Sequence, residues 1–550
     1  MDRLTKARHW NLLPLVLIGG ALFPLPAVAR DRLEKLNDAN YWVQLCTLVS
    51  TNKPAEALPA CERAIELRSG DAQLWARYGQ LQVELKQYPE AVASLDQALK
   101  RQAKNSQVLT DQCIALTELK QRDAAIETCE KALKINANWG NRSPVIAQRY
   151  AAISHNQPEV YERAVQFYSE ALAKQADDSL TLFYRGEALE KLGQHQAAIE
   201  ALDQALNGNG NWGPESPALA WYNRGLAHRN ANQLELAVQS FDRALLLNPN
   251  DAWGWFQQGN TLRQLKRLTE ALVAYGRAVE LQPNSAQILL AHCTALNQVQ
   301  QAEPALAACK KAIQGDGNWG EADVAQAWNQ QSLALATLGK LEEALASANR
   351  AVGMRPNWGE AWSDRAVVLW YLQRYEEALE SVQKALALNP NDARAWANQG
   401  RIWRSLNQPQ NALNAYAESL NRDPNNAVVW ANQSAVQWSL GNSAAALESA
   451  NRAIQANSNL AQGWQNRAVA LVALKQYPEA QKSYEQAIVL DQTNAEAWTG
   501  LGLVLAQQKQ YPKALQALQT AVSLNPKQAV AQQALKALME MQQQLNTPKL

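Results

Sequence analysis

The apolar and small residues of this chain recur at fixed places in a 34-residue period. In the segment that starts at Ala218, counted as position 1, Trp stands at position 4, Gly at 8, Ala at 20, Phe at 24, Ala at 27 and Pro at 32. The next segment starts at Ala252 and repeats this pattern, with Tyr at position 24. Each half of the period has an apolar stripe at helical spacing, and proline cannot continue a helix. The period therefore predicts two antiparallel helices, A and B, joined by a turn near position 15.

Fourteen such units follow one another over residues 38–528, at intervals of 34 residues except at three joints of 39. Alanine occupies position 20 in all fourteen units, which lets helix B lie close against helix A. No helix can bury its stripe alone, so stacked neighbours must share one continuous core. The units begin at Asp38, Ala72, Ser106, Val145, Ser179, Ala218, Ala252, Ala286, Ala325, Gly359, Ala393, Ala427, Ala461 and Ala495.

This pattern resembles the tetratricopeptide repeat, a helix–turn–helix unit of the same period. The resemblance implies an all-α fold, a right-handed α-solenoid of about fourteen units that acts as a binding scaffold. Residues 529–545 have a high helix propensity and a polar face, and we expect them to form a C-terminal capping helix followed by a tail, 546–550.

Composition and motifs argue against several functions. The net charge is +1, so the chain lacks the basic field that nucleic-acid binding requires. Its five histidines share no metal-ligand spacing, and no glycine-rich phosphate loop follows a strand pattern. We therefore expect no enzyme activity, no metal and no cofactor.

The N-terminal residues 1–29 read as an export signal. Basic residues precede an apolar run, Leu12–Leu22, and an Ala-x-Ala cleavage pattern ends at Ala29. The alternative is an uncleaved membrane anchor, which would be the only membrane contact. Either reading predicts a periplasmic, secreted or outward-facing protein.

The six cysteines support export independently. They lie at positions 8 and 24 of the third and eighth repeats, and correspondingly in the first repeat if its inter-helix turn is one residue shorter. These positions face each other in an antiparallel helix pair, where disulfide geometry can be met. Cysteine as a small buried hydrophobe is the alternative, but it does not explain why every cysteine falls in a pair. The predicted disulfides are Cys46–Cys61, Cys113–Cys129 and Cys293–Cys309.

Two candidate patches fall at the helix A positions that, by the resemblance, face a concave groove. Arginines flanked by aromatic residues suit a carboxylate, phosphate or sulfate group, or an acidic peptide with an apolar anchor. Exposed arginines that only stabilise neighbouring helices by stacking are the alternative. The first patch contains Trp370, Tyr371, Arg394, Asn398, Arg401, Arg404, Asn432 and Trp438. The second contains Tyr222, Asn223, Arg229, Trp253, Phe256, Gln257 and Arg263.

Asn-Trp-Gly occurs four times, and three of the copies precede the five-residue insertions that lengthen the period. We expect each insertion to extend the following helix A by about a turn, with Trp shielding the junction and Gly permitting a sharp bend. The alternative is a docking rim of tryptophans. The candidates are Trp139, Trp212, Trp319 and Trp358.

The leading hypothesis is a non-enzymatic scaffold outside the cytoplasm that binds a protein or peptide, one with an acidic segment fitting best. The first alternative is a protein that binds glycan or polysaccharide or assists polymer export, because aromatic rings also stack on sugars. The second is a subunit of a transferase complex, since the repeats also resemble the repeat region of O-linked N-acetylglucosamine transferases.

Overall fold

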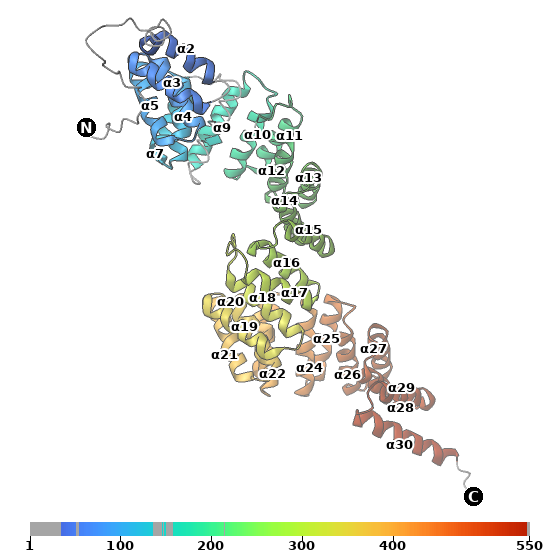
Figure 1. The fold of residues 1–550 in the computed structure, drawn as a ribbon. Helices are drawn as coiled ribbons and strands as arrows, with labels where there is room; N and C mark the ends of the chain where they lie inside the picture. Colours follow the sequence, from blue (N-terminus) through green and yellow to red (C-terminus); the bar gives the residue numbers. More distant parts are fainter. Residues whose placement is uncertain are drawn as a thin grey trace, which may run out of the picture. The chain divides into compact units, whose positions relative to one another are not determined.

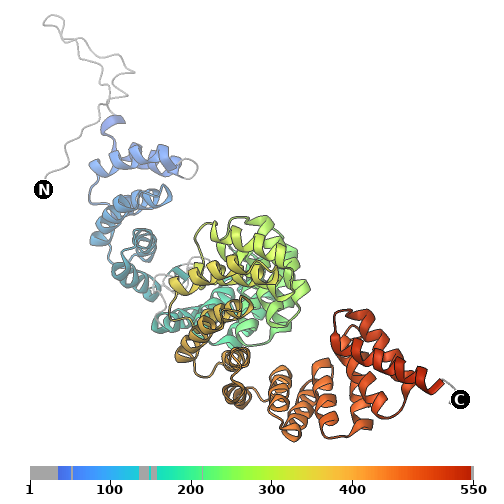
Figure 2. The same ribbon diagram turned by 90° about the horizontal axis from the view of Figure 1, so that it is seen from below.

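The structure is a computed structural model, and every regular element that it describes is an α-helix (Figures 1 and 2). The all-α prediction is confirmed. None of the helices in the described residues combines the length and apolarity that a membrane crossing needs. The described residues are 35–50, 54–135, 146, 148–149, 158–213 and 215–546.

The helices alternate as the period predicts, so that helix A of a repeat carries an even number in Figure 1 and helix B an odd one. Most A helices have 13 residues and most B helices 14. The helices are α2 (Ala39–Ser50), α3 (Pro54–Leu67), α4 (Ala72–Glu84), α5 (Tyr88–Arg101), α6 (Ser106–Glu118), α7 (Arg122–Ile135), α9 (Pro158–Leu172), α10 (Ser179–Lys191), α11 (His195–Leu206), α12 (Pro217–Asn230), α13 (Leu234–Leu247), α14 (Ala252–Gln264), α15 (Leu268–Leu281), α16 (Ala286–Gln298), α17 (Ala302–Ile313), α18 (Val324–Thr337), α19 (Leu341–Met354), α20 (Gly359–Tyr371), α21 (Tyr375–Leu388), α22 (Ala393–Ser405), α23 (Pro409–Arg422), α24 (Ala427–Ser439), α25 (Ser443–Ala456), α26 (Ala461–Ala473), α27 (Tyr477–Leu490), α28 (Ala495–Gln507), α29 (Tyr511–Leu524) and α30 (Ala529–Asn546).

The chain divides into two compact units, unit 1 up to Pro249 and unit 2 from Asn250. Within each unit, helix A packs on helix B of its own repeat, and helix B packs on helix A of the next. Helices A of successive repeats also contact each other, whereas successive B helices of the described repeats make at most marginal contact. Helix A therefore lines the inner side of each stack. The capping helix α30 closes unit 2 against α28 and α29.

Helices A and B approach most closely where a small residue at position 8 faces a large one at position 24. A Cβ atom added to Gly259 would lie 2.7 Å from the Tyr275 ring, and one added to Gly400 would lie 2.5 Å from the Tyr416 ring. Alanine at position 20 is fully buried in every repeat, as at Ala271. Small residues thus set the helix spacing, and one large ring fills the remaining space.

Two recurring features join and turn the units. In several repeats the Trp at position 4 donates its indole N–H to the carbonyl six residues earlier, as Trp396 does to Pro390 at 2.9 Å, which fixes helix A to the end of the preceding unit. The residue at position 15 adopts the left-handed conformation, for example Lys266 at φ 59° and Gly339 at φ 73°. This conformation ends helix A and reverses the chain into helix B.

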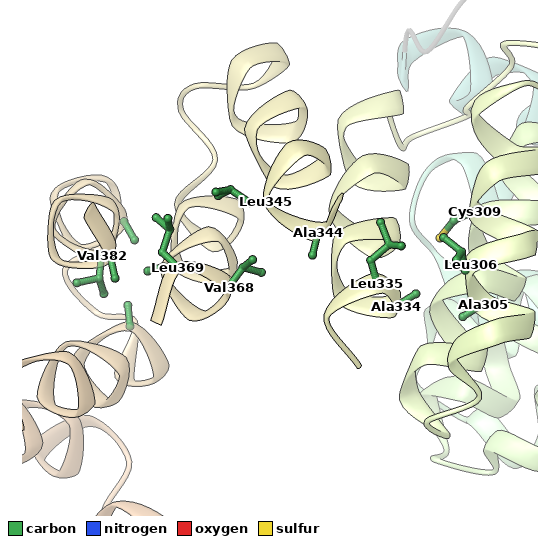
Figure 3. Packing of buried hydrophobic residues seen from close by; sticks show 14 of the residues in the cluster. Ala305, Leu306, Cys309, Ala334, Leu335, Ala344, Leu345, Val368, Leu369 and Val382 are labelled. Atoms are coloured by element: carbon green, nitrogen blue, oxygen red, sulfur yellow. The ribbon is translucent and has the colours of Figure 1, made fainter. Parts of the chain in front are cut away.

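The core of unit 2 is continuous across repeats rather than confined to each one. Figure 3 shows buried side chains that follow one another from Leu306 through Leu335 and Leu345 to Leu369 and Val382. Each apolar stripe therefore finds its partner in the adjacent repeat, as a stacked solenoid requires.

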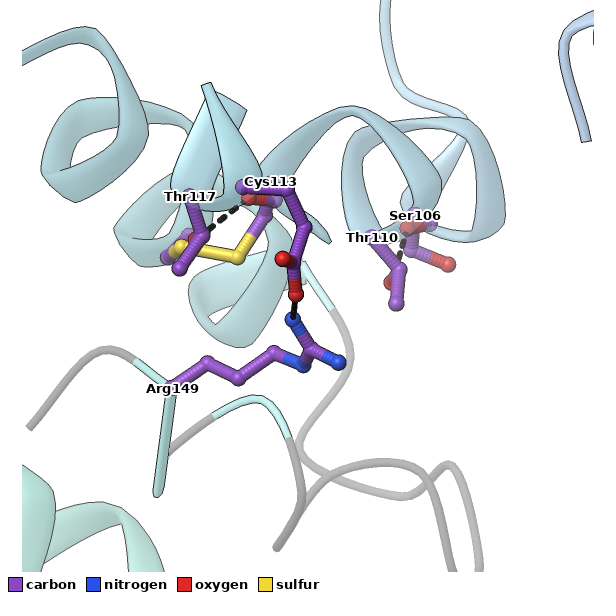
Figure 4. Close-up of a disulfide and its surroundings, with 7 residues drawn as sticks. Ser106, Thr110, Cys113, Thr117 and Arg149 are labelled. Carbon is purple, nitrogen blue, oxygen red and sulfur yellow. Dashed lines mark hydrogen bonds and ion pairs between the residues drawn. A yellow bond between two sulfur atoms is a disulfide. The ribbon is translucent and has the colours of Figure 1, made fainter. Parts of the chain in front are cut away.

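All three predicted disulfides are present, and their cysteines are fully buried. The Cα–Cα distances are 4.8, 5.0 and 5.3 Å, within the usual disulfide range, and the bridged residues lie 15, 16 and 16 positions apart. The cysteines take the place of the small–large pair at positions 8 and 24. Around Cys113, Thr117 donates its hydroxyl to the Cys113 carbonyl at 2.7 Å, and Arg149 pairs with Glu118 of the same helix at 2.9 Å (Figure 4).

The two insertions that precede α12 and α18 lengthen helix A by one residue, so the expectation of about a turn was wrong for them. The insertion at 140–144 lies outside the described residues. Helices α12 and α18 have 14 residues instead of 13. Gly213 and Gly320, the first residues of these two insertions, adopt positive φ, at 56° and 61°, and bend the chain there. An N-cap then starts the helix, Ser216 before α12 and Asp323 before α18.

The tryptophans of the Asn-Trp-Gly motifs contact their own junctions. Trp212 packs edge-on against Phe183, with ring centroids 6.5 Å apart, and Trp319 joins the apolar cluster around Leu289. Trp358 precedes α20 and carries the Arg355 guanidinium at 5.2 Å from its ring centre. The fourth candidate, Trp139, lies outside the described residues, as does the expected signal segment 1–29. The junction contacts favour the structural role over a docking rim.

Candidate functional site

The first patch lies on three successive A helices of unit 2, α20, α22 and α24. Repeat register places its residues at the inner-side positions 2, 6, 9, 12 and 13 of these helices. Three aromatic side chains reach solvent there: Tyr371 is 53% exposed, Trp438 is 48% exposed, and Trp370 is half-buried. The aromatic residues of the patch are therefore accessible to a ligand.

Arg401 and Trp370 form a contact between neighbouring repeats. The guanidinium carbon of Arg401 lies 4.2 Å from the centre of the Trp370 ring. The indole N–H of Trp370 donates to the hydroxyl of Ser405 at 2.8 Å, and its ring meets Tyr371 edge-on at 5.1 Å. A stacked guanidinium keeps its N–H donors in its own plane, so Arg401 is held in place with its donors still available.

Arg394 differs from the other two arginines because it has a carboxylate partner. Its guanidinium lies 3.3 Å from Asp364, which is buried and also accepts a hydrogen bond from Asn329 at 2.8 Å. Burial raises the pKa of Asp364, while Arg394 and Asn329 lower it in part. Sequence reasoning missed Asp364, because its partner stands 30 residues away on the next helix A.

Several of the position-6 amides bridge neighbouring A helices rather than reach into open solvent. Asn398 is buried and donates to the Ser363 hydroxyl at 3.2 Å, and Asn466 donates to the Ala431 carbonyl at 2.7 Å. Asn432, by contrast, is half-buried on α24. These amides position the inner helices, so the arginines and aromatic residues offer the more open contacts.

The Tyr416 hydroxyl lies behind the arginines and has no hydrogen-bond partner among the described residues, although the residue is fully buried. In repeat seven the equivalent tyrosine, Tyr275, donates to Asn260 at 2.8 Å. The residue equivalent to Asn260 is Arg401, which carries donors only. Burial raises the pKa of Tyr416 to about 12, against the lowering effect of Arg404 and Arg401.

Apolar residues continue the inner surface beyond the arginines. Positions 9 and 12 hold Arg401 and Arg404 in α22, Ala and Trp438 in α24, two valines in α26, and Leu503 with Ala in α28. Trp438 and Leu503 are 48% and 40% exposed. The inner face of unit 2 therefore presents two arginines at one repeat and apolar side chains at the next three.

The second patch is divided between the two units. In unit 1, Asn223 donates to Glu187 at 3.1 Å, and Tyr222 contacts Phe241 with ring centroids 5.9 Å apart. In unit 2, Phe256 is buried against the Tyr275 ring. Its side chain therefore serves the core. The remaining members, Arg229, Trp253, Gln257 and Arg263, are half-buried on their helices.

Unit 1 carries a buried acidic group that the sequence did not single out. Burial raises the pKa of Glu187 to about 7, although the Asn223 amide lowers it and Glu215 raises it further. Glu215 in turn accepts a hydrogen bond from the Tyr184 hydroxyl at 2.9 Å. No group of three or more metal-ligating side chains occurs in the described part of the chain.

Comparison with known proteins supports the repeat assignment. Family models, each described as tetratricopeptide repeat, match eight segments that together cover more than half of the chain. No curated protein matches the sequence. The matched segments are residues 48–110, 115–138, 159–214, 218–251, 252–285, 325–357, 363–427 and 466–529.

Solved structures with a similar arrangement of helices include three described as follows. The APC/C hetero-tetramer Cut9-Hcn1 is 15% identical over 94% of this chain and 99% of that chain, with a TM-score of 0.43. YrrB, "a TPR protein with an unusual peptide-binding site", is 22% identical over 34% of this chain and 97% of its own, with a TM-score of 0.30. Pseudomonas aeruginosa pilF is 21% identical over 38% and 95%, with a TM-score of 0.36. At these values we draw no functional conclusion from them.

Proposed function

The chain belongs to the tetratricopeptide repeat family, whose arrays are protein-interaction scaffolds, and we propose that it binds an extended protein segment along the inner face of unit 2. The proposal contains no catalytic step. The observation that carries it is the stacking of Arg401 on Trp370, next to Arg404 and the exposed Tyr371 and Trp438.

The surroundings of the arginines support binding over a purely structural role. Among the described residues, no carboxylate lies within ion-pair distance of Arg401 or Arg404, whereas Arg394 has Asp364. Exposed aromatic residues beside unpaired arginines are the usual composition of the centre of a binding site. The bridging amides hold these groups on rigid helices, which lowers the entropic cost of binding.

We also propose that the protein works outside the cytoplasm. Three buried disulfides use every cysteine of the chain, and such pairing is typical of oxidising compartments. The test is cell fractionation followed by mass spectrometry of the N-terminus of the purified chain. Recovery from the cytoplasmic fraction with free thiols would overturn this part of the proposal.

The binding proposal is tested with a phage-displayed library of random dodecapeptides selected on the full-length protein. The test variant combines Trp370→Ala, Arg401→Glu and Arg404→Glu. The control combines Arg452→Glu and Lys482→Glu, which reverse two exposed charges on the B helices α25 and α27.

We expect the selected peptides to bind the wild type and the control equally and not to bind the test variant. Equal binding to all three proteins would show that the peptides do not bind at this face of unit 2. If no peptide were enriched and the protein bound polysaccharides on a glycan array, the proposal would be overturned in favour of a glycan-binding role.

A further inference from the structure

Three hydrogen-bond donors of the helix pair α22 and α23 have no acceptor among the described residues. They are the guanidinium groups of Arg401 and Arg404 and the buried hydroxyl of Tyr416. The Tyr416 ring packs against α22 at Gly400, the residue before Arg401, where an added Cβ atom would lie 2.5 Å from the ring. A tyrosine hydroxyl that is shielded from water and has no acceptor costs free energy, so an acceptor at this place would be favoured.

The comparison with repeat seven explains how the missing acceptor arises. There the Tyr275 hydroxyl donates a hydrogen bond to the Asn260 side-chain oxygen at 2.8 Å, so the buried hydroxyl has an acceptor within its own repeat. In repeat eleven an arginine replaces that asparagine, and it stacks on Trp370 instead of closing the gap. The replacement therefore removes an acceptor and adds a positive charge, both of which favour an anion.

We propose that Arg401, Arg404 and Tyr416 form a subsite for the side-chain carboxylate of an acidic residue in an otherwise apolar peptide segment. This inference rests on the proposed function and names the class of segment that the groove takes. A carboxylate has the acceptor capacity for all three donors, and its charge matches the two arginines. In the described residues neither arginine has a competing carboxylate.

The neighbouring repeats set the pattern of the rest of the segment. Trp438 on α24, Val472 on α26 and Leu503 on α28 follow the arginines at equivalent inner positions. Packed helices lie about 8–10 Å apart, and an extended peptide advances about 3.3 Å per residue. The segment therefore carries one acidic residue and then apolar residues at intervals of about three.

The test uses synthetic dodecapeptides with leucine or phenylalanine at every third position and one variable position at the end of that series. The variable residue is Glu, Gln or phosphoserine, and each peptide is made with a free and an amidated C-terminus. Affinities are measured by calorimetry with the full-length wild type, Tyr416→Phe, Arg404→Gln and the control Tyr275→Phe. Tyr416→Phe removes only a hydroxyl without a partner, so it should not impair folding.

We expect the wild type to prefer the Glu peptide over the Gln peptide by at least about tenfold, whichever C-terminus is present. Tyr416→Phe and Arg404→Gln should each remove most of that preference, while Tyr275→Phe should keep it. Equal affinity for Glu and Gln peptides would overturn this inference and leave the proposed function standing.

The other outcomes are equally decisive. If affinity depended on a free C-terminus and not on Glu at the variable position, the subsite would bind a terminal carboxylate. That result would overturn the side-chain assignment. A phosphoserine peptide that binds far more tightly than the Glu peptide would overturn it in favour of a phosphate site. Absence of binding by every peptide, together with no enrichment from the random library, would count against the proposed function itself.

Discussion

Arg401 stacks on Trp370 across the boundary between two repeats, with the guanidinium carbon 4.2 Å from the ring centre. The other cation–π pairs among the described residues join residues within one repeat, such as Arg365 with Trp362 at 5.6 Å. The pair therefore couples α20 to α22 at the surface that we assign to binding. A ligand that engages Arg401 also acts on the contact between the two repeats.

This pair should contribute measurably to the stability of unit 2. In a double-mutant cycle of Trp370→Leu and Arg401→Gln, we expect a coupling free energy of about 0.5–1 kcal/mol, the usual range for a partly exposed cation–π contact. The measurement is urea unfolding of the wild type, both single variants and the double variant. Additive effects within error would show that the two side chains are adjacent without interacting.

The close approach at positions 8 and 24 predicts opposite effects for two glycine substitutions in repeat seven. Gly259→Ala places a Cβ 2.7 Å from the Tyr275 ring and should destabilise the protein by about 1–3 kcal/mol. Gly276→Ala meets nothing within 4 Å and should stabilise it by about 0.5–1 kcal/mol through helix propensity. Urea unfolding midpoints compare the two. A neutral Gly259→Ala would mean that the helices can move apart freely.

The stability of unit 1 should depend on pH through Glu187. Burial raises its pKa from 4.5 to about 7, so the folded state keeps a proton that the unfolded state has already released. The stability contributed by the protonated Glu187 is therefore full below pH 4.5 and is lost as the pH rises to about 7, by a total on the order of 3 kcal/mol.

The variant Glu187→Gln should remove this dependence because the amide cannot ionise. We expect it to match the wild type at pH 4 and to exceed it at pH 8, as measured by urea unfolding. The control is Glu235→Gln, which changes an exposed glutamate on α13 of the same unit. Parallel pH profiles of wild type and Glu187→Gln would rule out the shift.

Reduction of the disulfides should affect the first repeat most. That repeat has another repeat on one side only, and Cys46–Cys61 removes chain entropy worth about 3 kcal/mol from its unfolded state. Hydrogen exchange should therefore show α2 and α3 losing protection in reductant, while α16 and α17, packed between repeats, keep most of theirs. In a Cys46→Ala, Cys61→Ala variant, adding reductant should cause no further loss of hydrogen-exchange protection in α2 and α3. Uniform loss across both regions would contradict the expectation.

The sequence predicted those contacts that recur with the period. Helix positions, the disulfides and the small–large pairs all depend on residues within one repeat, and their spacing is constant. Residues that act between repeats escaped prediction. Asp364 binds Arg394 of the following repeat, and Glu187 binds Asn223 in the same way. Such pairs join positions that vary from unit to unit, so the period carries no information about them.

The Tyr416 hydroxyl shows a related limit. Its environment changes because one neighbouring position holds arginine where repeat seven holds asparagine. The two aligned repeats contain this difference, but only the structure shows that Tyr275 uses the asparagine as its acceptor. The helix extension after the insertions was overestimated for a similar reason, because the bends at Gly213 and Gly320 use most of the added residues.

The disulfides join helices of one repeat and never one repeat to the next, which matters if the chain is pulled from its ends. Under tension the repeats can still separate from each other one by one, because no disulfide cross-links one repeat to the next. The loops of 15, 16 and 16 residues, however, cannot extend, and they withhold roughly 16 nm of contour length. An array held between two anchored partners would lengthen under load, while three of its helix pairs would stay joined by their disulfides.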